Sequence, residues 1–147
     1  MDLKLVKETD LTVDDIAKFI LNTPSEVFKT AFYWSVNSVE FIRRLYDENF
    51  IMVFVDNKSH HNIYGLCVWA CINESDKHFI NKVRWTLPDD VRGGKILYIG
   101  LVILTMDCEV WQIKDKLEEL GYRKKIKEVL WFTDNRWRTR KVFDGNI

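Results

Sequence analysis

Hydrophobic residues along this chain follow two patterns. Some form continuous or alternating apolar runs, and others recur at the spacing of one helix face. Short stretches rich in β-branched and aromatic residues predict strands. The predicted strands are residues 3–7, 50–55, 63–72, 95–104, 127–133 and 137–143. The run at 95–104 is almost unbroken in its apolar character, so we expect a strand in the middle of a sheet with both faces buried.

Helical spacing predicts three helices, each with one apolar face. The first begins after Thr12, where Asp15 three residues later suits a capped helix start. The second lies within residues 37–49, and the third lies within residues 108–120 and ends at Gly121. The apolar positions that define them are Val13, Ile16, Ala17 and Ile20, then Phe41, Ile42, Leu45 and Tyr46, then Val110, Ile113, Leu117 and Leu120.

Two stretches stay ambiguous by pattern alone. Residues 25–34 are a helix, or a turn of helix followed by a loop. Residues 79–86 are a strand or a helix, and Pro88 shortly after them favours an extended end. Residues 88–94 carry the strongest loop signal of the chain, because they combine proline, two acids and two glycines.

The order of these elements predicts an α/β (α+β) fold with a mixed sheet. A helix within 108–120 is long enough to connect strands 95–104 and 127–133 as parallel neighbours. At 147 residues, the chain has the length of a single domain, which we assign to residues 1–147. The expected buried core includes Ile99, Leu101, Ile103, Ile113, Leu117, Leu130 and Phe132.

Charge is balanced overall but unevenly distributed. The formal net charge is zero, which gives no general attraction to nucleic acid or anionic lipid. Residues 121–141 nevertheless carry 8 Lys/Arg against 2 acids. Arg136, Arg138 and Arg140 alternate along a predicted strand and would share one face, which suits a phosphate-bearing or acidic partner. The alternative is an edge strand whose charges prevent aggregation.

Cysteine and histidine positions predict neither a disulfide framework nor a metal site. Three cysteines with no preceding signal peptide favour a reducing, cytoplasmic compartment, and no apolar run is long enough to span a membrane. His60 and His61 are expected to be exposed in a polar turn, whereas His78 is a slightly better acid–base candidate. Cys108 is either a packed or capping residue or a thiol activated by a helix start.

The second half of the chain resembles the GNAT superfamily of N-acetyltransferases. The resemblance lies in the strand 95–104 (KILYIGLVIL), the helix within 108–120 and the strand segment 128–132 (EVLWF). It also extends to a divergent branch found among phage proteins and toxin-activating acyltransferases. A GNAT-like fold has a mixed central sheet with helices on both faces.

The resemblance implies an acyltransferase that uses acyl-CoA, acetyl-CoA or a carrier thioester and acylates an amine of a protein or small molecule. It implies cofactor contacts at Ile103, Thr105, Cys108 and Asn135, with a backbone N–H near Ile103 polarising the thioester carbonyl. It identifies no catalytic base and requires no metal. A bacterial cell or a phage-infected host is the expected setting.

One segment departs from the family pattern. Residues 105–109, where active members place a glycine-rich, basic loop around pyrophosphate, contain no glycine or cation and include Asp107 and Glu109. Acids repel phosphate, so we expect weak or absent acetyl-CoA binding. Two alternatives remain: an inactive GNAT-fold binding protein, of phage or mobile-element origin, that acts on a host protein, or a nucleic-acid-binding module that uses the basic C-terminal strand. Balanced net charge disfavours the second.

Overall fold

The computed structural model describes residues 1–22, 36–56, 58, 61–77, 87–105, 108–133 and 136–141, with residues 36–38, 110, 123, 132–133 and 136–141 described by their backbone alone. The described residues form six strands, four α-helices and two 3-10 turns. The strands are β1 (Asp2–Leu5), β2 (Ile51–Val55), β3 (Ile63–Ile72), β4 (Ile96–Leu104), β5 (Glu128–Thr133) and β6 (Arg136–Lys141). The helices are α1 (Val13–Leu21), α3 (Val36–Asp47), α5 (Val110–Glu119) and α6 (Tyr122–Lys125), with 3-10 turns η1 (Val6–Glu8) and η2 (Glu74–Asp76).

The six strands form one mixed sheet in the order β1-β2-β3-β4-β5-β6. Neighbours are antiparallel except β4 and β5, which are parallel and are connected through α5 and α6. The predicted α+β class and the parallel pair are therefore confirmed. All six predicted strands are present with bounds within two residues, whereas the ambiguous stretches 25–34 and 79–86 lie outside the described residues.

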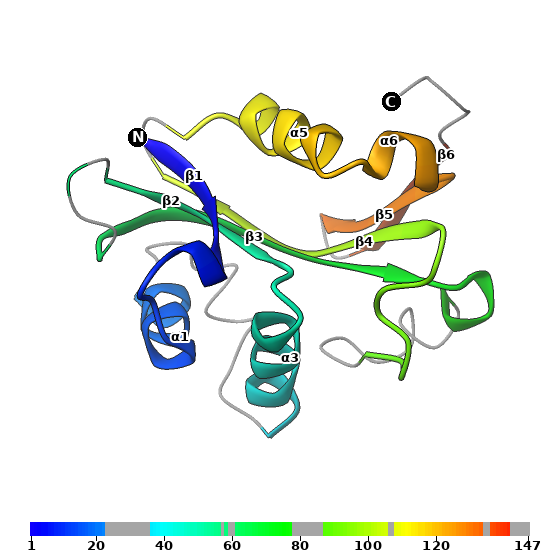
Figure 1. Cartoon of the computed structure of the whole chain (residues 1–147). Helices are drawn as coiled ribbons and strands as arrows, with labels where there is room; N and C mark the ends of the chain where they lie inside the picture. The colour runs from blue at the N-terminus through cyan, green and yellow to red at the C-terminus, as the bar shows by residue number, and fades with distance from the viewer. Residues whose placement is uncertain are drawn as a thin grey trace.

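Helices cover both faces of the sheet, with α1 and α3 on one face and α5 and α6 on the other (Figure 1). The first helix starts as its sequence predicts, because Asp15 Oδ2 accepts from Thr12 N at 2.8 Å and Thr12 Oγ1 accepts from Asp15 N at 3.2 Å. Its apolar face buries Ile16, Ala17 and Ile20 against the sheet.

The opposite face is closed by α5 and α6. Ile113 of α5 is buried, and Gly121 ends the helix with a φ of 88°, which favours glycine. In α6 the Tyr122 ring packs edge-on against Trp69, and its hydroxyl accepts from Trp69 Nε1 at 3.1 Å. This hydrogen bond satisfies the one polar group of a fully buried tryptophan.

The core lies on both sides of the central strands. Every residue of β2 is buried, and so are the last eight residues of β3. Burying one large aliphatic or aromatic side chain contributes about 1.5–3 kcal/mol, so these strands dominate stability. Of the expected core residues, Leu101, Ile103, Ile113 and Leu130 are buried, Ile99 and Leu117 are half-buried, and the Phe132 side chain lies outside the described part.

Candidate functional site

The pairing of β4 differs along its length. It pairs with β3 from Ile96 to Leu104, but its register with β5 runs only from Ile96–Glu128 to Ile99–Trp131. Both strands continue beyond this point, β5 as far as Thr133. Among the described residues, no β5 position pairs with residues 100–104, and we call the β5-facing side of this segment the unpaired edge.

A β-bulge marks the point where the parallel pairing ends. Val68 pairs with Leu101 and Trp69 pairs with Ile99, so Gly100 is an extra residue in β4. A Cβ at Gly100 would lie 2.5 Å from Cζ of Phe41, a buried ring of α3. The position therefore needs glycine for close packing against α3, as well as for the irregular strand.

The unpaired edge presents backbone groups of Val102 and Leu104. Thr105 N donates to Tyr64 O of β3 at 3.2 Å, and N–H groups alternate between the two sides of a strand. Ile103 is in register with Leu66, so its backbone N–H points towards β3 like that of Thr105. The N–H groups of Val102 and Leu104 point away from β3. Two backbone donors thus flank the predicted cofactor residue Ile103, whose own side chain is buried.

The turn after β4 folds back onto β3. Thr105 Oγ1 and Cys108 Sγ both donate to Tyr64 O, the thiol at 3.3 Å, and Cys108 N donates to Thr105 O at 3.2 Å. A Cβ at Gly65 would lie 3.1 Å from Cys108 Sγ, so the thiol packs closely on the strand. The side chains of Thr105 and Cys108, both predicted cofactor residues, are thus engaged by the protein itself.

The start of α5 carries an acid where a phosphate would be favoured. Glu109 precedes the first helical residue, and its N–H donates to Gln112 Oε1 at 3.2 Å. A carboxylate near a helix N-terminus is stabilised by the helix dipole and competes with any phosphate for the same charge. Weak acetyl-CoA binding therefore stays a prediction that only a binding measurement tests.

The three predicted arginines lie on β6, the last strand of the sheet. Arg136, Arg138 and Arg140 stand at alternate positions of β6, opposite Thr133, Trp131 and Val129 of β5. Asn135 lies outside the described residues. β6 therefore begins at the same end of the sheet as the unpaired edge, because Arg136 pairs with the last residue of β5.

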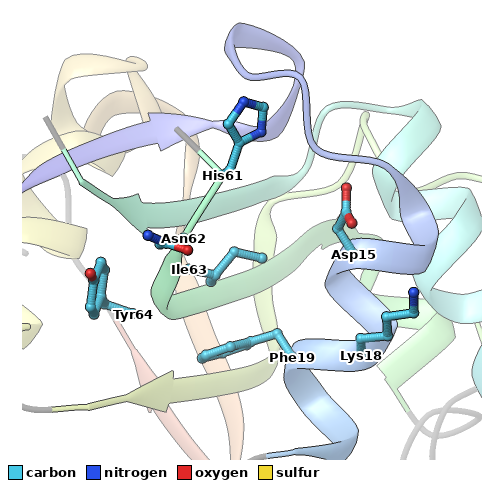
Figure 2. Close-up of a pocket in the computed structure, with 7 residues that line it drawn as sticks. All are labelled: Asp15, Lys18, Phe19, His61, Asn62, Ile63 and Tyr64. Carbon is cyan, nitrogen blue, oxygen red and sulfur yellow. The ribbon is translucent and has the colours of Figure 1, made fainter. Parts of the chain in front are cut away.

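A pocket of about 380 Å³ lies on the α1 side of the sheet, at the start of β3. Figure 2 shows side chains from α1 on one wall and from the turn and first residues of β3 on the other. Its lining residues are Asp15, Lys18, Phe19, His61, Asn62, Ile63 and Tyr64. The sequence places His61 in an exposed turn, which the structure confirms, but it gives no signal that α1 packs beside that turn.

In the described part of the chain, no group of three or more His, Cys, Asp or Glu residues could hold a metal ion. No helix in that part is long and apolar enough to cross a membrane. Burial raises the pKa of the Cys67 thiol to about 12 and also raises that of Cys71. Neither thiol is a nucleophile near neutral pH, because the thiolate is the reactive form.

No protein-family model matches the chain, and no curated protein matches its sequence.

Proposed function

We propose that the protein is a GNAT-like acyltransferase that moves an acyl group from a CoA or carrier thioester to an amine. The observation that supports this proposal is the parallel β4–β5 pair whose pairing ends at the Gly100 bulge. A strand that loses its partner on one side keeps backbone N–H groups there, fixed by the pairing on its other side. Such preorganised donors are what a developing oxyanion needs.

In the proposed reaction, the thioester carbonyl accepts from the N–H group of Val102, whereas the N–H group of Leu104, two residues further on, lies about 7 Å away along the strand and does not reach the same oxygen. The amine nitrogen attacks the carbonyl carbon, the C–S bond breaks, and the thiol leaves. Positioning of the two substrates supplies much of the rate. The odd number of cysteines, three in all, favours a reducing, cytoplasmic setting in a bacterial cell or an infected host, which is part of the proposal.

Donor binding is the first test. The acids around the start of α5 predict a Kd for free acetyl-CoA no tighter than about 100 μM, equivalent to about 5 kcal/mol. Isothermal titration calorimetry measures this directly. Tighter, micromolar binding would contradict the weak-site prediction and would favour acetyl-CoA itself as the donor.

Catalysis can be tested at one backbone atom. Val102→Pro removes an N–H on the unpaired edge while leaving the β3 ladder intact, and proline is tolerated where no ladder bond is lost. We expect the variant to fold and to keep most of its melting temperature. Its rate of acyl transfer should fall about 10²–10³-fold. The donors to be assayed are acetyl-CoA, a long-chain acyl-CoA and an acyl carrier protein.

The matched control is Leu101→Pro, which removes an N–H directed at β3 and should unfold the protein. Thiol release that is equal in the wild type and in folded Val102→Pro would exclude a role for this edge. Absence of transfer from all three donors to any amine would exclude the acyltransferase function.

The second candidate is a binding protein of the same fold without catalysis. Two observations support this candidate. The side chains of Thr105 and Cys108 are hydrogen-bonded to the Tyr64 carbonyl, and Glu109 lies at the start of α5. In this case the C-terminal arginines are the expected contact. Replacing Arg136, Arg138 and Arg140 with alanine should change stability by about 1 kcal/mol or less and weaken partner binding in a salt-dependent way. A large loss of stability with binding intact would show that the arginines are structural.

A further inference from the structure

The pocket between α1 and the start of β3 carries opposite charges on one wall. Asp15 and Lys18 are three residues apart on α1, so they share a helix face with Cβ atoms about 5–6 Å apart. No ion pair joins them among the described residues, although their charges interact and the Lys18 ammonium helps to lower the pKa of Asp15. A ligand can therefore meet both charges.

The Asp15 carboxylate has a lowered pKa, and one of its two oxygens receives no hydrogen bond from Thr12. Hydrogen bonding from the Thr12 backbone is the largest cause of its lowered pKa. Both bonds from Thr12, from N at 2.8 Å and from Oγ1 at 3.0 Å, reach Oδ2. In the described contacts Oδ1 has no such partner, so it can accept from an ammonium group.

The rest of the pocket is apolar at its base and polar at its rim. Phe19, Ile63 and Tyr64 are partly buried and pack against the core, whereas His61 and Asn62 are exposed. A volume of about 380 Å³ is at the lower end of the roughly 300–1,000 Å³ of ligand pockets, so the ligand is small.

Tyr64 connects this pocket to the unpaired edge. Its side chain lines the pocket, and its carbonyl oxygen accepts from Thr105 N, just beyond the last residue of β4. Adjacent strands are about 4.8 Å apart, so the pocket wall stands one strand spacing from the end of β4. The pocket and the unpaired edge therefore lie at the same end of the sheet.

We propose that the pocket binds the amine substrate and that this substrate is a free α-amino acid with an apolar side chain. Asp15 receives the ammonium, Lys18 the carboxylate, and Phe19, Ile63 and Tyr64 the side chain. The acceptor role rests on the proposed acyltransferase function. The reaction balances as thioester plus ammonium giving amide, free thiol and one proton, which leaves to water at the rim beside His61.

The test compares three ligands that share the leucine side chain but differ in their charged groups: L-leucine, L-leucinamide and N-acetyl-L-leucine. Backbone amide NMR shifts of residues 15–19 and 61–64 report binding at the pocket. We expect L-leucine to shift these amides and the two derivatives, each lacking one charge, to bind at least tenfold more weakly. Equal binding of the three, or no shift with L-leucine at roughly 10 mM, would overturn the proposal.

Two substitutions test whether Lys18 and Asp15 bind the charged groups of the ligand. Lys18→Met and Asp15→Asn should each raise the Kd for L-leucine at least tenfold. Lys124→Met, at an exposed lysine of α6, controls for charge. This control should leave the Kd within twofold. An unchanged Kd in folded Lys18→Met would overturn the proposal even if Asp15→Asn does not fold.

A mass-spectrometric assay of N-acyl-leucine separates the two proposals. L-leucine that binds the pocket and is acylated from a thioester supports both. Acylation of other amines but not L-leucine would overturn the acceptor assignment alone. Binding at the pocket without acylation of any amine would overturn the acyltransferase function and with it the acceptor role.

Discussion

The two ends of β4 are held in different ways. At its start, residues 96–99 pair with β3 and with β5, and the preceding loop extends the sheet beyond Ile51, the first residue of β2. In that loop, Val91 O accepts from Cys71 N at 2.8 Å, and Gly94 N donates to Cys71 O at 3.2 Å. The loop therefore behaves as a short additional partner of β3.

Side chains reinforce this anchored end. Asp90 accepts from the N–H groups of Arg92 at 3.0 Å and Gly93 at 2.8 Å, and from Asn73 Nδ2 at 3.1 Å. Arg92 in turn pairs with Glu48 at the end of α3. One loop thus joins β3, β4 and α3.

The other end of β4 has a partner on one side only. Its turn is bonded to Tyr64, while Val102 and Leu104 face the side on which pairing with β5 has ended. The contrast shows how a sheet can hold free backbone donors in place. One end of the strand is fixed on both sides, and β3 alone then positions the donors at the other end, as a preorganised site requires.

The largest effect is expected at the anchored end, from Gly94→Ala. A Cβ there would overlap the carbonyl group of Ile72 and lie 2.5 Å from the amide nitrogen of Asn73, so backbone would have to move. We expect a loss of roughly 3 kcal/mol or more in urea unfolding, or no folded protein. A melting temperature within a few degrees of the wild type would show that the loop is not an anchor.

Gly121→Ala is the matched control for that substitution. A Cβ at Gly121 meets nothing within 4 Å, but the φ of 88° remains unfavourable for alanine. The cost should be about 1 kcal/mol, which measures backbone strain without a clash.

Next in size is the loss of packing on the α5 face. Ile113 is 6% exposed and Leu117 is half-buried, so Ile113→Ala should cost about 2–5 kcal/mol and Leu117→Ala less, about 1–2 kcal/mol. Reversible urea denaturation of the two variants tests the order. A larger loss for Leu117 would mean that the C-terminal half of α5 packs more closely on the sheet than the half that carries Ile113.

Much of the fold could be predicted because local patterns and packing agree. The apolar run in β4, the Thr12 cap and Gly121 each act within a few residues, and each is found as expected. The degree of burial along α5 was harder to predict, since Ile113 and Leu117 have the same helical spacing. Only the position of the helix over the sheet distinguishes them.

The site was less predictable, because its parts come from distant segments. The absence of glycine and cations after β4 is visible in the sequence, but the bulge at Gly100 appears only when β3 and β4 are in register. The pocket joins α1 to the start of β3, more than 40 residues along the chain, and no local motif links Asp15 to His61.

Gly100→Ala probes the boundary between the two halves of β4. Its Cβ would contact a ring carbon of Phe41 rather than backbone, so the cost should be smaller than at Gly94, about 1–3 kcal/mol. Adding Phe41→Leu removes the ring that the new Cβ would meet. The double variant should therefore lose less stability than the sum of the losses of the two single variants. Strict additivity in a double-mutant cycle would show that the ring and the bulge are not coupled.

The smallest effect is expected from removing one charge of the anchored end, by Asp90→Asn. Backbone N–H donation from Gly93, and then from Arg92, lowers the pKa of Asp90, so the ionised form is favoured by folding. Stabilisation by that form is complete above the unfolded pKa of about 3.9 and is lost as the pH falls through the lower, folded pKa. The wild type should therefore melt slightly above Asp90→Asn near neutral pH, and the difference should shrink towards zero as the pH falls below the unfolded pKa of about 3.9. Asp89→Asn is the control, because among the described contacts Asp89 uses its backbone carbonyl, which accepts from Arg44. A difference that persists unchanged in acid would show that Asp90 acts through packing of the turn and not through its charge.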